Sequence, residues 1–333
     1  MGVYETGVFM TEYYLGFDIG GTKCAVVLGM YKDGNMTIAD KTSFATQTEK
    51  GWEFAVGNIF SAAEKMIAAN SLSDKDFVSI GISCGGPLDS KKGVIMSPPN
   101  LPGWDNVPIT AMCEEKFGVK AYLQNDANAC GVAEWQFGAA KGAENAVFLT
   151  FGTGLGAGLI LGGRLYEGTN GMAGEVGHIR LSPHGPVGYG KEGSFEGFCS
   201  GGGIAQLGRT MALEAIQKGE SVSFCQGIDS LDGITAKSVA EAAKNGDPVA
   251  KKVYEVCGEY LGRGLSVIID ILNPEVVVIG SIYERSSELL IESMEREIKK
   301  EALSASSSVC RIVPAVLGDS IGDYAALAVA VNK

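Results

Sequence analysis

The stretch YLGFDIGGTKCAVVLG, residues 14–29, places two runs of β-forming residues around a short polar turn. Residues 13–18 and 24–29 are predicted strands, and the glycine pair between them predicts a hairpin. A P-loop or a dinucleotide-binding turn would instead be followed by a helix. The tip of this hairpin offers free amides, a hydroxyl group and a lysine, and successive turn amides can bind an anion. A plain structural turn is the alternative interpretation.

A second stretch from residue 146, AVFLTFGTGLGAGLILGGRLY, repeats the order of strand, glycine turn and strand. Its turn contains Gly152, Thr153 and Gly154. The repetition indicates two related lobes, and two such tips could hold a polyphosphate between them. Asp18 ends the first strand, where a carboxylate can hold Mg²⁺ directly or through water. An Asx turn is the alternative role for this residue.

The rest of the chain alternates strand and helix patterns, which predicts an α/β fold, and 333 residues are enough for two domains. Apolar periodicity and turn signals define the remaining elements. The predicted strands cover residues 77–83, 120–124, 275–281 and 311–316. The predicted helices cover residues 52–67, 108–117, 125–135, 203–217, 235–244, 248–272 and 319–331.

Composition excludes several classes of protein. Asp and Glu number 39 against 27 Lys and Arg, and the net charge of −12 argues against non-specific binding to nucleic acid or anionic membranes. The eight cysteines form no C-x-x-C pair, which is typical of reduced thiols in a cytoplasmic protein. No secretory signal is visible, and the uncharged residues 145–163 are too rich in glycine for a membrane span.

Two further groups of polar residues could carry chemistry. Asn125 and Asp126 follow a strand and open a predicted helix, where the helix dipole should lower the pKa of Asp126. Such a carboxylate is a weak base near neutral pH, which phosphoryl transfer tolerates, and a simple N-cap is the alternative. Glu175 and His178 lie in the glycine-bounded GEVGH motif, with Glu196 further on, and these groups can direct ligand hydroxyls.

Several motifs occur in order along nearly the whole chain: DIGGTK, GISCGGPLD, NLPGW, NDANA, FGTGLGAG, GEVGH and FEGFCSGGG. Together they resemble the ROK family of repressors, uncharacterised reading frames and sugar kinases. The resemblance implies a two-lobed actin-like (ribonuclease-H-like) ATPase fold, with ATP and Mg²⁺ at an active site in the interlobe cleft, and a homodimer. The expected lobes are residues 1–124, with the C-terminal helix 319–333 packing back on them, and residues 125–318.

The resemblance also assigns roles to individual residues. Asp126 matches the catalytic base that takes the proton of the attacking sugar hydroxyl. The expected sugar-binding residues are Gly86, Asn100, Asn125, Asp126, Glu175, His178 and Glu196. The expected nucleotide-binding residues are Asp18, Gly20, Gly21, Thr22, Lys23, Gly152, Thr153, Gly154 and Gly280, of which Asp18 also assists Mg²⁺.

One loop departs from the family pattern. The family usually carries a zinc-binding C-x-C-G-x-x-G-C run, whereas residues 187–194 read VGYGKEGS and contain no cysteine. We therefore expect no structural zinc, because the ligand set of a closed tetrahedral site is missing. The loop 181–197 should then be held by packing, with Tyr189 and Phe195 as candidates.

The resemblance leaves the acceptor open. A glucokinase-like hexose kinase acting on the 6-hydroxyl is the first hypothesis, and a kinase for an N-acetylhexosamine such as GlcNAc or ManNAc, or for another hexose, is the second. A sugar-responsive repressor is less favoured. About a dozen residues precede the first predicted strand, too few for a helix-turn-helix, and the acidic charge opposes DNA binding.

Overall fold

The computed structural model describes residues 11–332, and the chain divides into two compact units. The first unit contains the chain up to Lys141 and from Asp319 onward, and the second is Gly142–Gly318. Helix α3 (Asp126–Phe137) packs against the C-terminal helix α11 (Ile321–Val331) inside the first unit. The boundary expected before residue 125 therefore differs from the observed division, which falls after α3.

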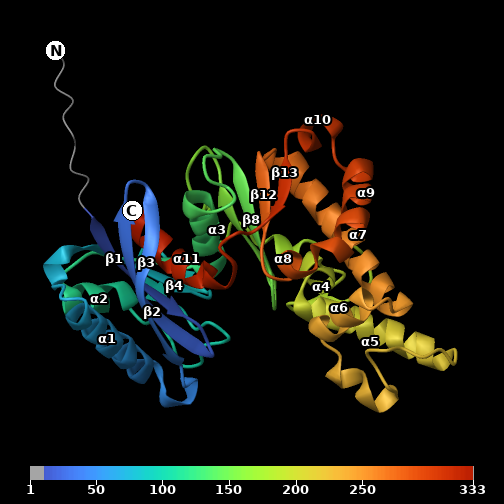
Figure 1. The fold of residues 1–333 in the computed structure, drawn as a ribbon, viewed down its shortest axis with the longest axis horizontal. Helices are drawn as coiled ribbons and strands as arrows, with labels where there is room; N and C mark the ends of the chain where they lie inside the picture. Colours follow the sequence, from blue (N-terminus) through green and yellow to red (C-terminus); the bar gives the residue numbers. More distant parts are fainter. Residues whose placement is uncertain (1–10, 333) are drawn as a thin grey trace. The chain divides into compact units, whose positions relative to one another are not determined.

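The first unit is built on a five-stranded sheet, of which strands β1 to β4 are labelled in Figure 1. The strand order is β3-β2-β1-β4-β7. Strands β1, β2 and β3 form an antiparallel meander, whereas β1, β4 and β7 run parallel. The strands are β1 (Glu12–Ile19), β2 (Lys23–Lys32), β3 (Asn35–Ala45), β4 (Phe77–Cys84) and β7 (Ala121–Asn125), with a small separate pair formed by β5 (Leu88–Asp89) and β6 (Val94–Ile95).

Alternating side chains of β1 reach the two faces of this sheet, as the period of a strand requires. Leu15 and Phe17 are buried against α1 (Trp52–Ala69) and α2 (Ile109–Phe117), whereas Tyr14 faces the layer of α11. Gly81 on β4 permits α11 to approach closely, because a β-carbon there would collide with the backbone of the helix. Helix α11, from the last part of the chain, is thereby packed on strands from its first part.

The second unit has a four-stranded sheet in the order β13-β12-β8-β9, in which only the β8–β9 pair is antiparallel. The strands are β8 (Ala146–Phe151), β9 (Leu155–Ile160), β12 (Val276–Ile279) and β13 (Arg311–Pro314). The α-helices are α4 (Phe195–Phe198), α5 (Gly201–Gln217), α6 (Ala236–Lys244), α7 (Pro248–Leu272), α8 (Ile282–Ser286), α9 (Ile291–Glu301) and α10 (Ser304–Ser307).

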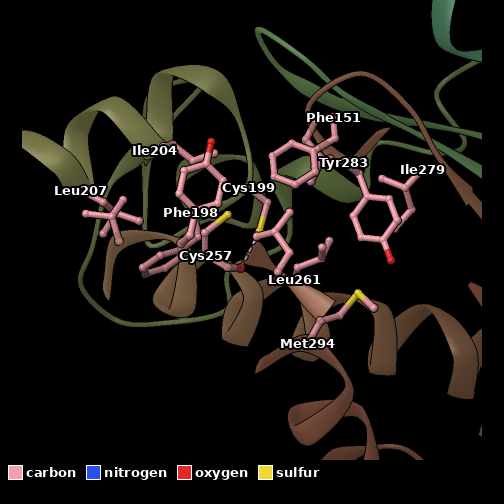
Figure 2. Close-up of a cluster of buried hydrophobic side chains, with 14 of the residues drawn as sticks. Phe151, Phe198, Cys199, Ile204, Leu207, Cys257, Leu261, Ile279, Tyr283 and Met294 are labelled. Atoms are coloured by element: carbon pink, nitrogen blue, oxygen red, sulfur yellow. Dashed lines mark hydrogen bonds between the residues drawn. The ribbon is translucent and has the colours of Figure 1, made fainter. Parts of the chain in front are cut away.

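The core of the second unit joins its sheet to α4, α5 and α7. Phe151 at the end of β8 and Phe198 on α4 are buried together with Leu261 of α7 (Figure 2). The Cys199 thiol donates a hydrogen bond to the carbonyl oxygen of Cys257 at 3.5 Å. Each fully buried large side chain contributes about 1.5–3 kcal/mol of hydrophobic free energy. This packing fixes the glycine turn that follows Phe151.

The structure confirms the α/β class, both predicted hairpins and the predicted long helices. Strand β3 was not predicted from the sequence. Within residues 11–332, no helix combines the length and apolar character needed to cross a lipid bilayer.

Candidate active site

The glycine turn between β1 and β2 is a hairpin tip, as predicted. The Gly20 amide donates to the Lys23 carbonyl oxygen at 3.0 Å, and Thr22 and Lys23 are exposed. A β-carbon on Gly21 would collide with the carbonyl oxygen of Asn100. The absence of a side chain therefore lets the turn pack directly on the loop that carries Asn100, so these two predicted segments lie together.

Asp18 occupies the strand end beside this turn, in a strongly negative environment. Burial raises the pKa of Asp18 to about 6, and the neighbouring carboxylates of Asp323 and Asp126 add to the rise. The ammonium groups of Lys23 and Lys41 act in the opposite direction. Removing water from a carboxylate and placing like charges near it both favour the protonated form. Among the described residues, burial and like charge thus outweigh the two cations at Asp18.

Asp126 begins α3, and Asn125 is the N-cap. The Ala127 amide donates both to Asn125 Oδ1 at 3.0 Å and to Asp126 Oδ1 at 2.8 Å. A β-carbon on Gly86 would lie 3.3 Å from Asn125 Nδ2, so the Gly86 loop borders this helix start. The predicted residues Gly86, Asn125 and Asp126 are therefore brought together.

The expectation of a lowered pKa for Asp126 was wrong. Loss of hydration raises the pKa of this carboxyl group above its ordinary value, and the hydrogen bond from Ala127 lowers it only in part. The side chain is nevertheless reached by solvent, so water moderates the rise. The helix N-terminus lowers the pKa through local structure, whereas the surrounding protein raises it by excluding water. Here the effect of the surrounding protein is larger.

Sequence reasoning missed Asp323 and Lys41. Asp323 is 4% exposed, and its carboxylate forms an ion pair with Lys41 Nζ from β3. A β-carbon on the preceding residue, Gly322, would lie 2.8 Å from Asp18 Oδ2, which places the start of α11 directly on Asp18. The available signal was a single acidic residue in the otherwise apolar segment IGDYAALAVAV of α11.

The second glycine turn, Gly152–Gly154, joins β8 to β9. The Gly152 amide donates to the Gly154 carbonyl oxygen at 3.1 Å, and the amide of Gly201, at the start of α5, donates to the Gly152 carbonyl oxygen at 2.8 Å. Thr153 is exposed at the tip. A β-carbon on Gly152 would lie 3.5 Å from Ser281 Oγ, so this turn borders the loop that follows Gly280.

Glu196 links this turn to the GEVGH segment. Its Oε2 accepts a hydrogen bond from the Leu155 amide at 2.9 Å and would lie 2.8 Å from a β-carbon on Gly154. A β-carbon on Gly177 would lie 3.3 Å from Glu196 Cβ. Glu175 and His178 flank Gly177, and both are exposed. The second unit therefore groups Gly154, Glu196 and the GEVGH residues at one end of β8 and β9.

Of the two residues expected to pack the loop 181–197, only one is buried. Phe195 is fully buried, as expected, but Tyr189 is 81% exposed, so its expected role in the packing of the loop was wrong. A two-stranded hairpin, β10 (Val187–Gly188) and β11 (Lys191–Glu192), orders the loop instead. Among the described residues, no group of three or more His, Cys, Asp or Glu side chains is placed to hold a metal. The absence of structural zinc stays a prediction.

Comparison with known proteins places the chain among sugar kinases and regulators. The ROK family model matches residues 14–333. A glucokinase of Halalkalibacterium halodurans is 31% identical, over 93% of this chain and 92% of that protein. A xylose repressor of Caldicellulosiruptor bescii is 27% identical, over 87% of this chain and 71% of the repressor.

The similar solved structures include ligand complexes. The ROK family glucokinase of Streptomyces griseus in complex with glucose and AMPPNP is 28% identical, with a TM-score of 0.73, and the match covers 96% of this chain and all of that one. The actin-like (ribonuclease-H-like) ATPase fold predicted from the sequence is confirmed by this similarity and by the α/β architecture of each unit.

Proposed function

The chain belongs to the ROK family, and on this premise we propose that it is a hexose kinase that transfers the γ-phosphoryl group of ATP to the 6-hydroxyl of glucose. One observation carries the proposal. Asp126 is a solvent-reached carboxylate of raised pKa, close enough to Asp18 at the glycine turn for their charges to interact. Transfer of a phosphoryl group to a hydroxyl requires a base next to the site that binds the phosphate. The glucokinase relatives support the choice of acceptor.

In the proposed reaction, the Asp126 carboxylate accepts the proton of the attacking sugar hydroxyl. The raised pKa makes it a better base than an ordinary surface aspartate. The hydrogen bond from Ala127 fixes one carboxylate oxygen, so the carboxylate is held in a defined orientation toward the hydroxyl that it is proposed to bind. Orientation contributes most here, because the phosphoryl-transfer transition state is loose and demands little from the base.

We assign the remaining sugar contacts to side chains that accept or donate hydrogen bonds directionally. Asn125, Glu175, His178 and Glu196 are proposed to bind the sugar hydroxyl groups. Gly86 and Asn100 contribute through loops whose tight packing lets the backbone come close to a ligand.

The proposed nucleotide contacts are backbone amides of two turns. Residues Gly20–Lys23 and Gly152–Gly154 offer the amides, with the Thr22 and Thr153 hydroxyls and the Lys23 ammonium group exposed beside them. We assign Gly280 to the adenosine side of the nucleotide, because the next residue, Ser281, borders the second turn.

The residues around Asp18 fit a magnesium ion that arrives with the nucleotide. Asp18 and Asp126 interact through like charge, while Lys41 is already paired with Asp323. This leaves negative charge that a divalent cation would offset. Mg²⁺ is usually held by one or two carboxylates together with substrate phosphates, so a full protein ligand set is not needed. We propose that Asp18 holds the ion, through water, and that the ion supplies charge neutralisation at the transferred phosphoryl group.

We also propose a homodimer without structural zinc, in a reducing cytoplasmic environment. All eight cysteines are free, which supports the reducing location. Elemental analysis of the purified protein should find far less than one zinc per chain. Stoichiometric zinc would contradict the proposal.

The alternative function is that of a transcriptional repressor. It is favoured by the similarity to a xylose repressor, most of whose length the chain matches. An N-acetylhexosamine kinase also stays open, since an acetyl group is recognised by pocket shape. The test is a coupled assay with ATP and Mg²⁺ over glucose, mannose, fructose, allose, N-acetylglucosamine and N-acetylmannosamine. Turnover of glucose above the others is expected. Turnover of none, together with a sequence-specific mobility shift of DNA, would replace the kinase by the repressor.

A further inference from the structure

The tip of the β10–β11 hairpin carries a tyrosine, Tyr189, in a left-handed backbone conformation that is unusual for this residue type. Gly188 pairs with Lys191, so Tyr189 and Gly190 form a two-residue loop, and both have positive φ, 43° and 73°. A loop of this kind is a type I′ turn, in which the first position favours asparagine, aspartate or glycine. Tyrosine is strained there, because its β-carbon crowds the backbone. Strained side chains that persist are concentrated at functional sites.

Burial does not explain this tyrosine, because 81% of it is exposed. Among residues 11–332, its aromatic contact is with the imidazole of His178, edge to face, with ring centroids 6.4 Å apart and planes at 75°. On the other side of the turn, Lys191 Nζ donates a hydrogen bond to the His178 carbonyl oxygen at 2.7 Å. The hairpin therefore holds His178 at both its ring and its backbone.

The hairpin is itself held by contacts with α5, Glu196 and Arg180, so it can keep His178 in a fixed position. Gln206 of α5 binds the backbone of Val187 twice, accepting from its amide at 3.0 Å and donating to its carbonyl oxygen at 2.9 Å. A β-carbon on Gly188 would lie 2.8 Å from Glu196 Cβ, so the hairpin also rests on a second proposed sugar-binding residue. Arg180 Nη1 adds a hydrogen bond to the Glu192 carbonyl oxygen at 2.7 Å.

We propose that Tyr189 and Lys191 are positioning residues, which orient the His178 imidazole for hydrogen bonding to the sugar. The proposal rests on the function proposed above, because it presumes that His178 binds the substrate. An imidazole on an exposed segment would otherwise lose rotational freedom on binding, and that entropy would weaken the sugar complex. The edge contact with Tyr189 restrains the ring beforehand, and the Lys191 hydrogen bond restrains the backbone that carries it.

Tyr189→Asn separates this role from a merely structural one. Asparagine suits the first position of a type I′ turn, so the hairpin should persist and the thermal midpoint should be equal or higher, while the ring contact is lost. We expect the KM for the hexose to rise about five- to tenfold, with the KM for ATP and kcat within about twofold. Tyr189→Phe, which keeps the ring, should restore the wild-type KM. Tyr166→Asn, at a half-exposed tyrosine elsewhere in the unit, is the matched control and should change neither constant.

A second measurement works without turnover. The chain has only two histidines, His178 and His184, so ¹⁵N-labelled histidine gives two imidazole spin systems, assigned with a His184→Gln variant. Tyr189→Asn should shift and broaden the His178 signals, and Tyr166→Asn should leave them unchanged. An unchanged hexose KM in an active Tyr189→Asn enzyme, or unchanged His178 signals, would overturn the proposal. Wild-type protein that turns over no hexose would instead overturn the kinase assignment, and the imidazole signals would still decide the positioning.

Discussion

Two glycine turns, one in each unit, close hairpins with the same strand pairing. In the first unit β1 pairs antiparallel with β2 and parallel with β4, and in the second β8 pairs antiparallel with β9 and parallel with β12. The two turns differ at the residue before the last one of the leading strand. This residue is Asp18 in β1 and Thr150 in β8.

The two residues have different tasks. Thr150 Oγ1 accepts a hydrogen bond from the Gly156 amide at 2.9 Å and so closes its own hairpin. Asp18 lies instead beside two other carboxylates that raise its pKa. The same position of a common hairpin therefore closes the hairpin in one unit and, in the other, carries a carboxylate whose charge a ligand would stabilise. The predictions below test this difference.

The largest loss of activity should follow substitution of Asp126, the carboxylate that interacts with Asp18. Asp126→Asn removes the proposed base and leaves the size of the side chain nearly unchanged, so kcat should fall roughly 10²–10⁴-fold. The sugar dissociation constant, measured by calorimetry, should stay within a few-fold. Asp33→Asn is the control, because Asp33 is exposed in a left-handed turn that asparagine also tolerates. Near-full activity of Asp126→Asn would remove this residue as the base.

A smaller loss is expected at the turn itself. Asp18→Asn should lower kcat/KM for MgATP about a hundredfold, the scale of one preorganised electrostatic interaction at a transferred phosphoryl group. The dependence of the rate on magnesium concentration should become weaker at the same time. An Asp18→Asn enzyme with an unchanged magnesium dependence would show that this carboxylate does not assist the ion.

The same substitution should stabilise the free protein, with a defined dependence on pH. The pKa of Asp18 is raised from 3.8 to about 6 in the folded state, so its contribution to stability is fully present below about pH 4 and is lost as the pH rises through 6. Asp18→Asn removes this loss. Without ligands it should be more stable than wild type by roughly 1–3 kcal/mol at pH 8 and equally stable at pH 4. Urea unfolding at the two pH values measures this difference, and a pH-independent effect would argue against a raised pKa.

The sequence predicts the elements of the site better than their electrostatics. Glycine turns between β-forming runs define the two hairpins, because the turn chemistry and the strand period are local. Strand β3 (Asn35–Ala45) is missed because most of it is exposed, and so it lacks the apolar alternation of a half-buried strand.

Properties that depend on distant neighbours could not be read from local patterns. The pKa of Asp126 depends on how much protein surrounds its carboxylate, and a rule for helix N-termini gives the wrong direction. Asp323 reaches Asp18 only because α11 returns to the first sheet from the far end of the chain. The exposure of Tyr189 likewise depends on a hairpin that its aromatic character alone does not predict.

The smallest effect should be that of Thr150→Val in the second turn. Valine suits a strand, but it cannot accept the hydrogen bond from the Gly156 amide. The free energy of unfolding should therefore fall by about 1 kcal/mol, and kcat/KM for MgATP should stay within about threefold, because the turn remains closed by backbone pairing. Thr150→Ser, which retains the hydroxyl group, should be indistinguishable from wild type in both measurements. If Thr150→Val instead loses as much activity as Asp18→Asn without losing stability, the two turns contribute equally to the chemistry and the proposed division of tasks is wrong.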